Sequence, residues 1–206
     1  MSDVALPIPG THAEGRPAAP RAPRDFQIVP LMGLPIVAVI FAALVAAIIA
    51  NRLWPLMFLH VVFGAAWTII DLFLGFVIGP IMKRLPVPAR IELTTRLMPR
   101  TVVIMPTVVT VTLAAGWQLG TLMGTVNSSY YNHGWIVASY IVVGCMAVIA
   151  LGLLSPANIA VLFELRKPEP NPAVIQTLTK RFIYAAGFTG TLQLATLVIM
   201  TKIRVG

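Results

Sequence analysis

One stretch of the sequence, WPLMFLHVVFGAAWTIIDLFLGFVIGPIMKR at residues 54–84, restricts what the chain can fold into more than any other. It is apolar over more than the roughly 20 residues that an α-helix needs to cross a bilayer. Residues at positions i, i+4, i+7 and i+11 share one face of a helix, and His60, Gly64, Trp67 and Asp71 have this spacing. The sequence therefore predicts a membrane helix with one polar stripe, on which we expect the function to lie.

The composition indicates a protein with several membrane helices. Hydrophobic residues make up 58% of the chain and charged residues only 11%, whereas soluble domains carry about 25% charged residues. The net charge of +8 comes from Lys and Arg beside the apolar runs, so it indicates orientation in a membrane and not nucleic-acid binding. A single cysteine, Cys145, excludes an intrachain disulfide and a CxxC metal site. The sequence contains no phosphate-binding loop, HExxH or Gly-x-Ser-x-Gly motif.

Five apolar segments are predicted to cross the membrane in an all-α fold. We expect them at Leu31–Ala50, at Trp54–Met82, at Thr101–Gly124, from about Trp135 towards Glu164, and from Pro172 to Lys202. Residues 86–100 are typical of a short amphipathic helix at the membrane surface. The predicted organisation is a Pro-rich arm (1–30) that is disordered unless a partner binds it, an extra transmembrane helix (31–50), and a four-helix bundle (51–206).

The distribution of basic residues predicts the orientation of these helices. Twelve Lys and Arg residues lie in the N-terminal arm and in the loops after the second and fourth spans, against three on the opposite side. Because cytoplasmic loops are enriched in Lys and Arg, the N-terminus is predicted inside and the C-terminus outside. We expect a multi-pass protein of a bacterial inner membrane.

Two segments suggest an internal duplication. Residues 88–96 (PARIELTTR) and 172–180 (PAVIQTLTK) share Pro-Ala-x-Ile-(Glu/Gln)-x-x-Thr-(Arg/Lys) at an offset of 84 residues. The same offset lays the second span on the fourth and the third on the fifth. The last four helices are therefore predicted to form a bundle built from a duplicated helix pair, with a pseudo-two-fold axis along the membrane normal. In this alignment Asp71 corresponds to Ser155.

The sequence also resembles a known family. Leu59-His60, Trp67, and Pro80 before the basic Lys83-Arg84 turn are similar to a pattern in the four-helix membrane family that includes the copper-resistance D protein, the bacterial membrane protoporphyrinogen oxidase and related integral membrane proteins of unknown function. The resemblance covers roughly residues 54–206. It implies a four-helix bundle in which the histidine matching His60 is a candidate haem ligand. Asp71 lies outside the family pattern.

The aromatic and histidine residues allow more than one interpretation. His60 is a candidate axial ligand for haem b, with Trp67 and Trp117 stacked on the porphyrin. In the alternative, His60 forms a hydrogen bond to a neighbouring helix and the tryptophans only pack. A copper site that combines His60 with His133 of the outer loop is a further, less favoured possibility.

Asp71 is the strongest anomaly, because a carboxylate at mid-bilayer costs several kcal/mol unless it is paired, hydrated or protonated. It would act as a proton relay, as a partner for a haem propionate, or as an anchor for a positive group on another subunit. The structural alternative is a protonated Asp71 bonded to Ser155, Thr110 or a backbone carbonyl. Gln193 is expected to hydrogen-bond across the bundle. Five glycines are expected to allow close helix contact, namely Gly64, Gly75, Gly79, Gly187 and Gly190.

Three functions follow from these alternatives. The leading hypothesis is a b-type haem-binding protein or the membrane subunit of a redox complex, with electron transfer through haem on His60. The second is a cofactor-free anchor or assembly subunit that contacts other membrane or redox subunits through residues 1–30 and span 31–50. The third is copper or proton transport that uses Asp71.

Overall fold

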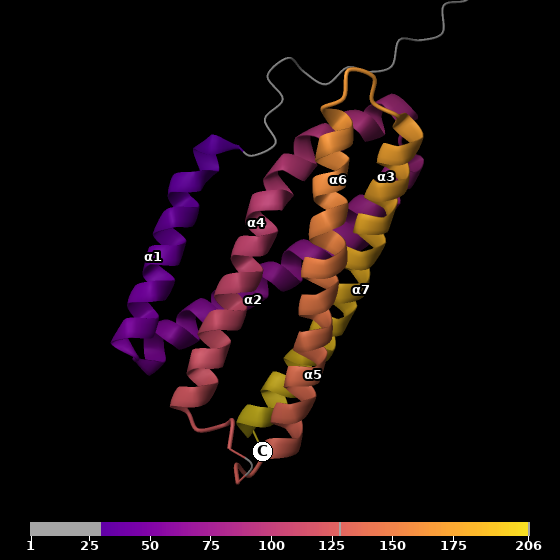
Figure 1. Cartoon of the computed structure of the whole chain (residues 1–206). Helices are drawn as coiled ribbons and strands as arrows, with labels where there is room; N and C mark the ends of the chain where they lie inside the picture. The colour runs from indigo at the N-terminus through magenta and orange to yellow at the C-terminus, as the bar shows by residue number, and fades with distance from the viewer. Residues whose placement is uncertain (1–29, 128, 206) are drawn as a thin grey trace, which may run out of the picture.

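The computed structural model describes residues 30–127 and 129–205, and this part of the chain is entirely helical apart from its turns. Five helices are long and apolar enough to cross a membrane (Figure 1). They cover Leu31–Ala50, Leu53–Arg84, Val87–Leu122, His133–Leu165 and Pro172–Ile203. The prediction of an all-α membrane protein with five membrane helices is therefore confirmed, whereas the prediction for the arm lies outside the described residues except at Pro30.

Two of the five spans are interrupted by a π-helical turn. The elements are a 3₁₀ turn (Leu31–Gly33), α1 (Leu34–Ala50), α2 (Leu53–Leu72), a first π turn (Phe73–Ile78), α3 (Gly79–Arg84), α4 (Val87–Leu122), α5 (His133–Ile149), a second π turn (Ala150–Leu154), α6 (Ser155–Leu165) and α7 (Pro172–Val205). The second span is thus α2, the first π turn and α3, and the fourth span is α5, the second π turn and α6.

Each π turn lies immediately before a Ser-Pro or Gly-Pro step. The N–H groups of Gly79 and Ser155 bond to carbonyls five residues earlier, at Leu74 and Ala150. The prolines that follow lack an N–H and disturb the regular helical bonding, which is where π turns and kinks arise. Both halves of the predicted bundle therefore contain one interrupted and one continuous span. The 84-residue offset does not pair Pro80 with Pro156, so the repeat stays a prediction.

The helices form two groups, one of α1 and α4 and the other of α5, α6 and α7, and α2 contacts both groups. In Figure 1, α2 runs obliquely behind α4 towards the upper part of α7, while α5 and α6 stand beside α7. The main core lies between these elements and includes Trp67, Met98, Leu162 and Phe182. The helix α1 packs on α4 and α2 at the edge of the molecule, where it buries little more than Leu44 and Ala47.

The prediction of a separate surface helix at residues 86–100 is wrong, because residues 87–100 are the first part of the continuous helix α4. Its 36 residues extend about 54 Å at 1.5 Å per residue, which exceeds the thickness of a hydrocarbon core. Pro99 lies inside the helix without ending it. One face of the segment contacts protein, because Ile91 and Met98 are buried against the other helices.

The predicted start of the last helix is confirmed, since the side chain of Asn171 caps it. Its Oδ1 accepts a hydrogen bond of 3.0 Å from the Ala173 N–H, and its own N–H donates to Oε1 of Glu164 at 3.1 Å. The Glu164 carboxylate also pairs with Lys167. The turn between α6 and α7 is therefore held by hydrogen bonds at both ends.

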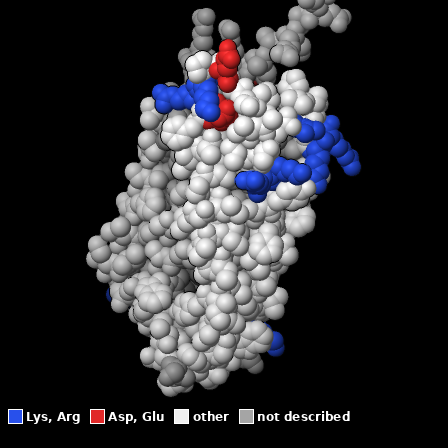
Figure 2. Space-filling model, turned by 45° about the vertical axis from the view of Figure 1, so that its right-hand side comes forward, with Lys and Arg blue, Asp and Glu red and all other residues white. Residues whose placement is uncertain are grey.

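Cationic side chains gather at one end of the helices. Figure 2 shows most of the visible Lys and Arg side chains in the upper half, with a wide uncharged belt below them and a few blue atoms at the lower edges. At this end Glu92 and Arg96 form a salt bridge with 2.6 Å between their charged atoms. This is the charge distribution that the orientation prediction used, and which end faces the cytoplasm stays a prediction.

Candidate functional site

The polar stripe of the second span contacts two different helices. Since α2 crosses obliquely between its neighbours, the part near His60 lies against α4, and the part near Asp71 lies against α7. The sequence correctly placed these residues on one stripe. The stripe nevertheless forms two separate sites.

The carboxyl group of Asp71 is fully buried at the contact between α2 and α7, with 0% of the residue exposed. Its Oδ2 atom accepts a 3.0 Å hydrogen bond from the Gln193 amide and another of 3.0 Å from the Thr189 hydroxyl. The predicted partners Ser155 and Thr110 are wrong: the Ser155 hydroxyl bonds to the Ala150 carbonyl, and Thr110 is exposed. The expectation that Gln193 bonds across the bundle is confirmed.

Several polar atoms around this carboxyl group have no hydrogen-bond partner within the described residues. They are Oε1 of Gln193 and Oδ1 of Asp71, beside which the indole N–H of Trp67, one helical turn earlier, lies without forming a hydrogen bond of full geometry. A buried polar atom without a partner costs about 1–3 kcal/mol, and such atoms in native proteins call for a physical explanation. The site therefore has hydrogen-bonding capacity left for a proton or a small polar guest.

The predicted close helix contacts at glycines are confirmed beside this site. A Cβ atom added to Gly75 would lie 2.8 Å from the backbone nitrogen of Gly187 and closer still to its Cα. One added to Gly190 would lie 3.0 Å from the Leu72 side chain, and one added to Gly79 would lie 2.9 Å from Ile183. The backbones of α7 and the first π turn thus touch, which brings Thr189 and Gln193 within reach of Asp71.

His60 forms a hydrogen bond between helices. Its Nδ1 lies 2.9 Å from the carbonyl oxygen of Thr112, and because a carbonyl only accepts, Nδ1 carries the proton. A Cβ on Gly116 would lie 2.6 Å from the ring, so the imidazole occupies the space that this glycine leaves. The Nε2 lone pair remains available in the neutral ring.

The other predicted site residues lie apart from His60. Trp67 is buried beside Asp71, whereas Trp117 is 58% exposed and contacts Tyr140 with 6.0 Å between ring centroids. His133 is the first residue of α5 and not part of the loop, and its Nδ1 is buried without a partner among the described residues. The described residues contain no group of three or more His, Cys, Asp or Glu side chains that could hold a metal ion.

A cavity of about 440 Å³ lies between α3, the first turns of α4 and the first turns of α7. It reaches Gly75, one helical turn from Asp71, and its lining includes Lys83, Arg90 and Lys180. Sequence reasoning missed this cavity and also missed Thr189. A usable signal for Thr189 was its spacing of four residues from Gln193 on one apolar helix, with Gly190 between them.

Comparison with known proteins adds no family: no protein family, curated protein or solved structure matches the chain. The fold and site define it as a multi-pass membrane protein with five candidate spans and a buried carboxyl group between two of them. The resemblance described above stays a prediction.

Proposed function

We propose that this membrane protein transfers protons on Asp71. The observation that carries the proposal is the position of this carboxyl group, which is buried among apolar helices and accepts hydrogen bonds from Thr189 and Gln193 on Oδ2. Intramembrane carboxyl groups are functional by default, because an unused one would be costly to keep.

The surroundings of Asp71 are polar but uncharged. The salt bridges of the described residues are Glu92–Arg96 and Glu164–Lys167, both at the cationic end, so no cation in this part of the chain pairs with Asp71. A proton is the simplest group that neutralises an unpaired buried carboxylate. The cavity that extends to Gly75 provides an approach to within one turn of the site.

The test is proton flux in liposomes that contain the purified protein. Asp71→Asn keeps the shape of the side chain and an oxygen that accepts from Thr189, but it cannot bind and release a proton. We expect this variant to lose flux. The matched control is Glu92→Gln, which makes the same chemical change at an exposed carboxylate. Undiminished flux in a folded Asp71→Asn protein would refute the proposal.

A second candidate, haem binding on His60, is favoured by one specific observation. Histidines that ligate metals usually donate their other ring N–H to a carbonyl or carboxylate, and His60 does so through Nδ1 to Thr112. Its Nε2 thus fits one axial bond to a haem iron, which would supply one-electron chemistry. An optical spectrum of haem-replete protein tests this candidate: a Soret band should be present in the wild type and in His133→Ala, and lost in His60→Ala.

A further inference from the structure

The cavity at the cationic end has the chemistry of an anion site. Its volume of about 440 Å³ is within the roughly 300–1,000 Å³ of small-molecule pockets. Sixteen residues line it and none of them is Asp or Glu. Three are permanently or normally cationic, and they come from three separate helices: Lys83 on α3, Arg90 on α4 and Lys180 on α7. Positive charge from three helices therefore lines one open cavity, and no acidic side chain of the described residues lines it.

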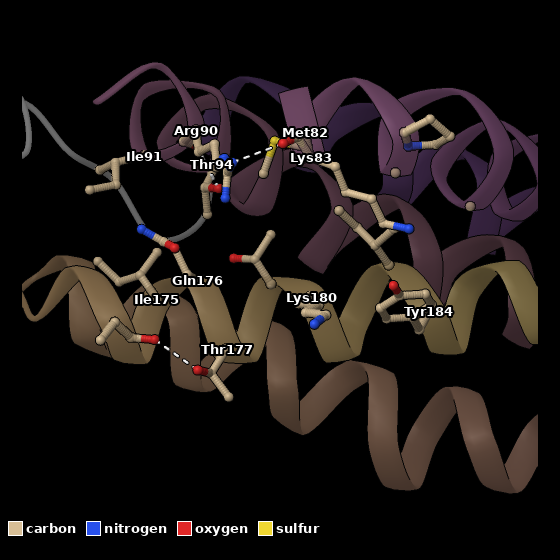
Figure 3. Close-up of a pocket in the computed structure, with 16 residues that line it drawn as sticks. Met82, Lys83, Arg90, Ile91, Thr94, Ile175, Gln176, Thr177, Lys180 and Tyr184 are labelled. Carbon is tan, nitrogen blue, oxygen red and sulfur yellow. Dashed lines mark hydrogen bonds between the residues drawn. The ribbon is translucent and has the colours of Figure 1, made fainter. Parts of the chain in front are cut away.

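These cations are held in place by the protein. The ammonium groups of Lys83 and Lys180 lie 5.1 and 5.8 Å from the centre of the same Tyr184 ring, within the range of cation–π attraction. The Arg90 guanidinium donates from Nε to the Leu85 carbonyl at 2.7 Å and from one terminal nitrogen to the Lys83 carbonyl at 2.9 Å. Its other N–H groups are left for a ligand. Figure 3 shows Lys83 on one wall of the cavity and Lys180 with Tyr184 on the other.

One further polar group in the lining has no partner within the described residues. Thr179 is 2% exposed, and its buried Oγ1 atom makes no hydrogen bond there. The neighbouring threonines Thr94 and Thr177 instead donate to carbonyls of their own helices. A buried hydroxyl costs free energy when it is left unpaired, so the Thr179 hydroxyl indicates a ligand that supplies an acceptor.

Much of the remaining lining is apolar and buried within the protein. Met82, Ile91, Ile175 and Ile183 share the cavity with the cations. Lys83 lies at the end of the second span, eight residues and therefore about 12 Å along the span from Gly75. A site that places cations between membrane helices, near the end of the spans, is suited to an anionic lipid headgroup.

We propose that this cavity binds the phosphate headgroup of an anionic phospholipid. The cations Lys83, Arg90 and Lys180 neutralise the phosphate, and the Thr179 hydroxyl donates to one of its oxygens. This inference goes beyond the proton transfer proposed above and does not depend on it.

The test is native mass spectrometry of the detergent-purified protein with added phosphatidylglycerol or phosphatidylcholine. The wild type should retain phosphatidylglycerol preferentially. Each of Lys83→Gln and Lys180→Gln should weaken its affinity about fivefold, as expected for one cation near a membrane surface. The matched control is Arg181→Gln, which removes the same charge from the adjacent exposed position of α7 and should change affinity little.

Two further measurements separate the possible results. Thr179→Val is nearly isosteric and removes no hydrogen bond of the fold, so weaker lipid binding by this stable variant would support a direct contact. The proposal would be overturned if Lys180→Gln and Arg181→Gln changed the affinity for phosphatidylglycerol equally. It would also be overturned if the wild type retained the two lipids equally. Displacement of phosphatidylglycerol by millimolar inorganic phosphate alone would overturn the assignment to a lipid and leave a site for free phosphate.

Discussion

Replacement of Gly75 by alanine should destabilise the protein strongly, because this glycine allows α7 to touch the second span. The added methyl group would lie 2.8 Å from the Gly187 nitrogen and closer to its Cα. Both obstructing atoms belong to the backbone, so no side-chain rotation can relieve the overlap. The helices must move apart at the level of Asp71, which lies one turn away.

The magnitude follows from two contributions. Overpacking of a close contact costs about 1–3 kcal/mol. Separation of the helices also weakens the hydrogen bonds from Thr189 and Gln193 to Asp71, and interhelical hydrogen bonds in membranes average about 0.6 kcal/mol each. We therefore expect Gly75→Ala to lose about 2–4 kcal/mol. Gly187→Ala should lose less, because its methyl group would lie 3.3 Å from the Gly75 Cα atom.

The assay is reversible unfolding in mixed micelles, monitored by tryptophan fluorescence, with Gly144→Ala as the matched control. A Cβ on Gly144 meets no atom within 4 Å, and alanine is favoured over glycine by up to about 1 kcal/mol within a helix. The control should therefore be as stable as the wild type or slightly more stable. If Gly75→Ala unfolds at the same denaturant concentration as Gly144→Ala, the close backbone contact is refuted.

Three other predictions concern separate parts of the chain. Gly116→Ala should displace the His60 ring, destabilise the protein by about 1–3 kcal/mol through overpacking and weaken any Soret band. Gly134→Ala, where the added methyl group meets open space, should have none of these effects. Unchanged stability of Gly116→Ala in the same unfolding assay would contradict this prediction. Asn171→Ala should cost about 1 kcal/mol by removing the cap of α7, and unfolding midpoints that coincide with the wild type would count against it. In a Cys145→Ala background, Tyr131→Cys should react with an impermeant maleimide added to intact cells, because its loop is predicted to lie outside. Lys167→Cys should not react, because its loop is predicted to lie inside. The reverse labelling would show that the orientation is inverted.

The sequence was sufficient to predict the helices because their signals are local. A run of about 20 apolar residues determines a span irrespective of its neighbours, and the Asn171-Pro172 pair determines where the last helix begins. The prediction failed at residues 86–100, where charged and apolar residues mix as they do in a surface helix. Tertiary burial of Ile91 and Met98, which the local pattern does not reveal, extends α4 instead.

The partners of Asp71 illustrate what local signals cannot provide. The spacing of His60, Gly64, Trp67 and Asp71 fixes one helix face, and the structure keeps that face intact. Which helices the face meets depends on the crossing direction of α2, and that direction depends on contacts such as Gly75 with Gly187, more than 100 residues apart in the sequence. The duplication suggested Ser155 as the opposing residue, but α7 takes that place.

The separation of the stripe into two sites also changes how its residues can act. His60 is fixed by Thr112 and Gly116 on α4, and Asp71 by Thr189 and Gln193 on α7, so neither residue shares a hydrogen-bond partner with the other. Substitutions at distant sites without shared partners have additive effects on stability. The double variant of His60→Ala and Asp71→Asn should therefore lose the sum of the two single losses in free energy of unfolding. A deviation above about 0.5 kcal/mol would instead mean that the two sites work as one.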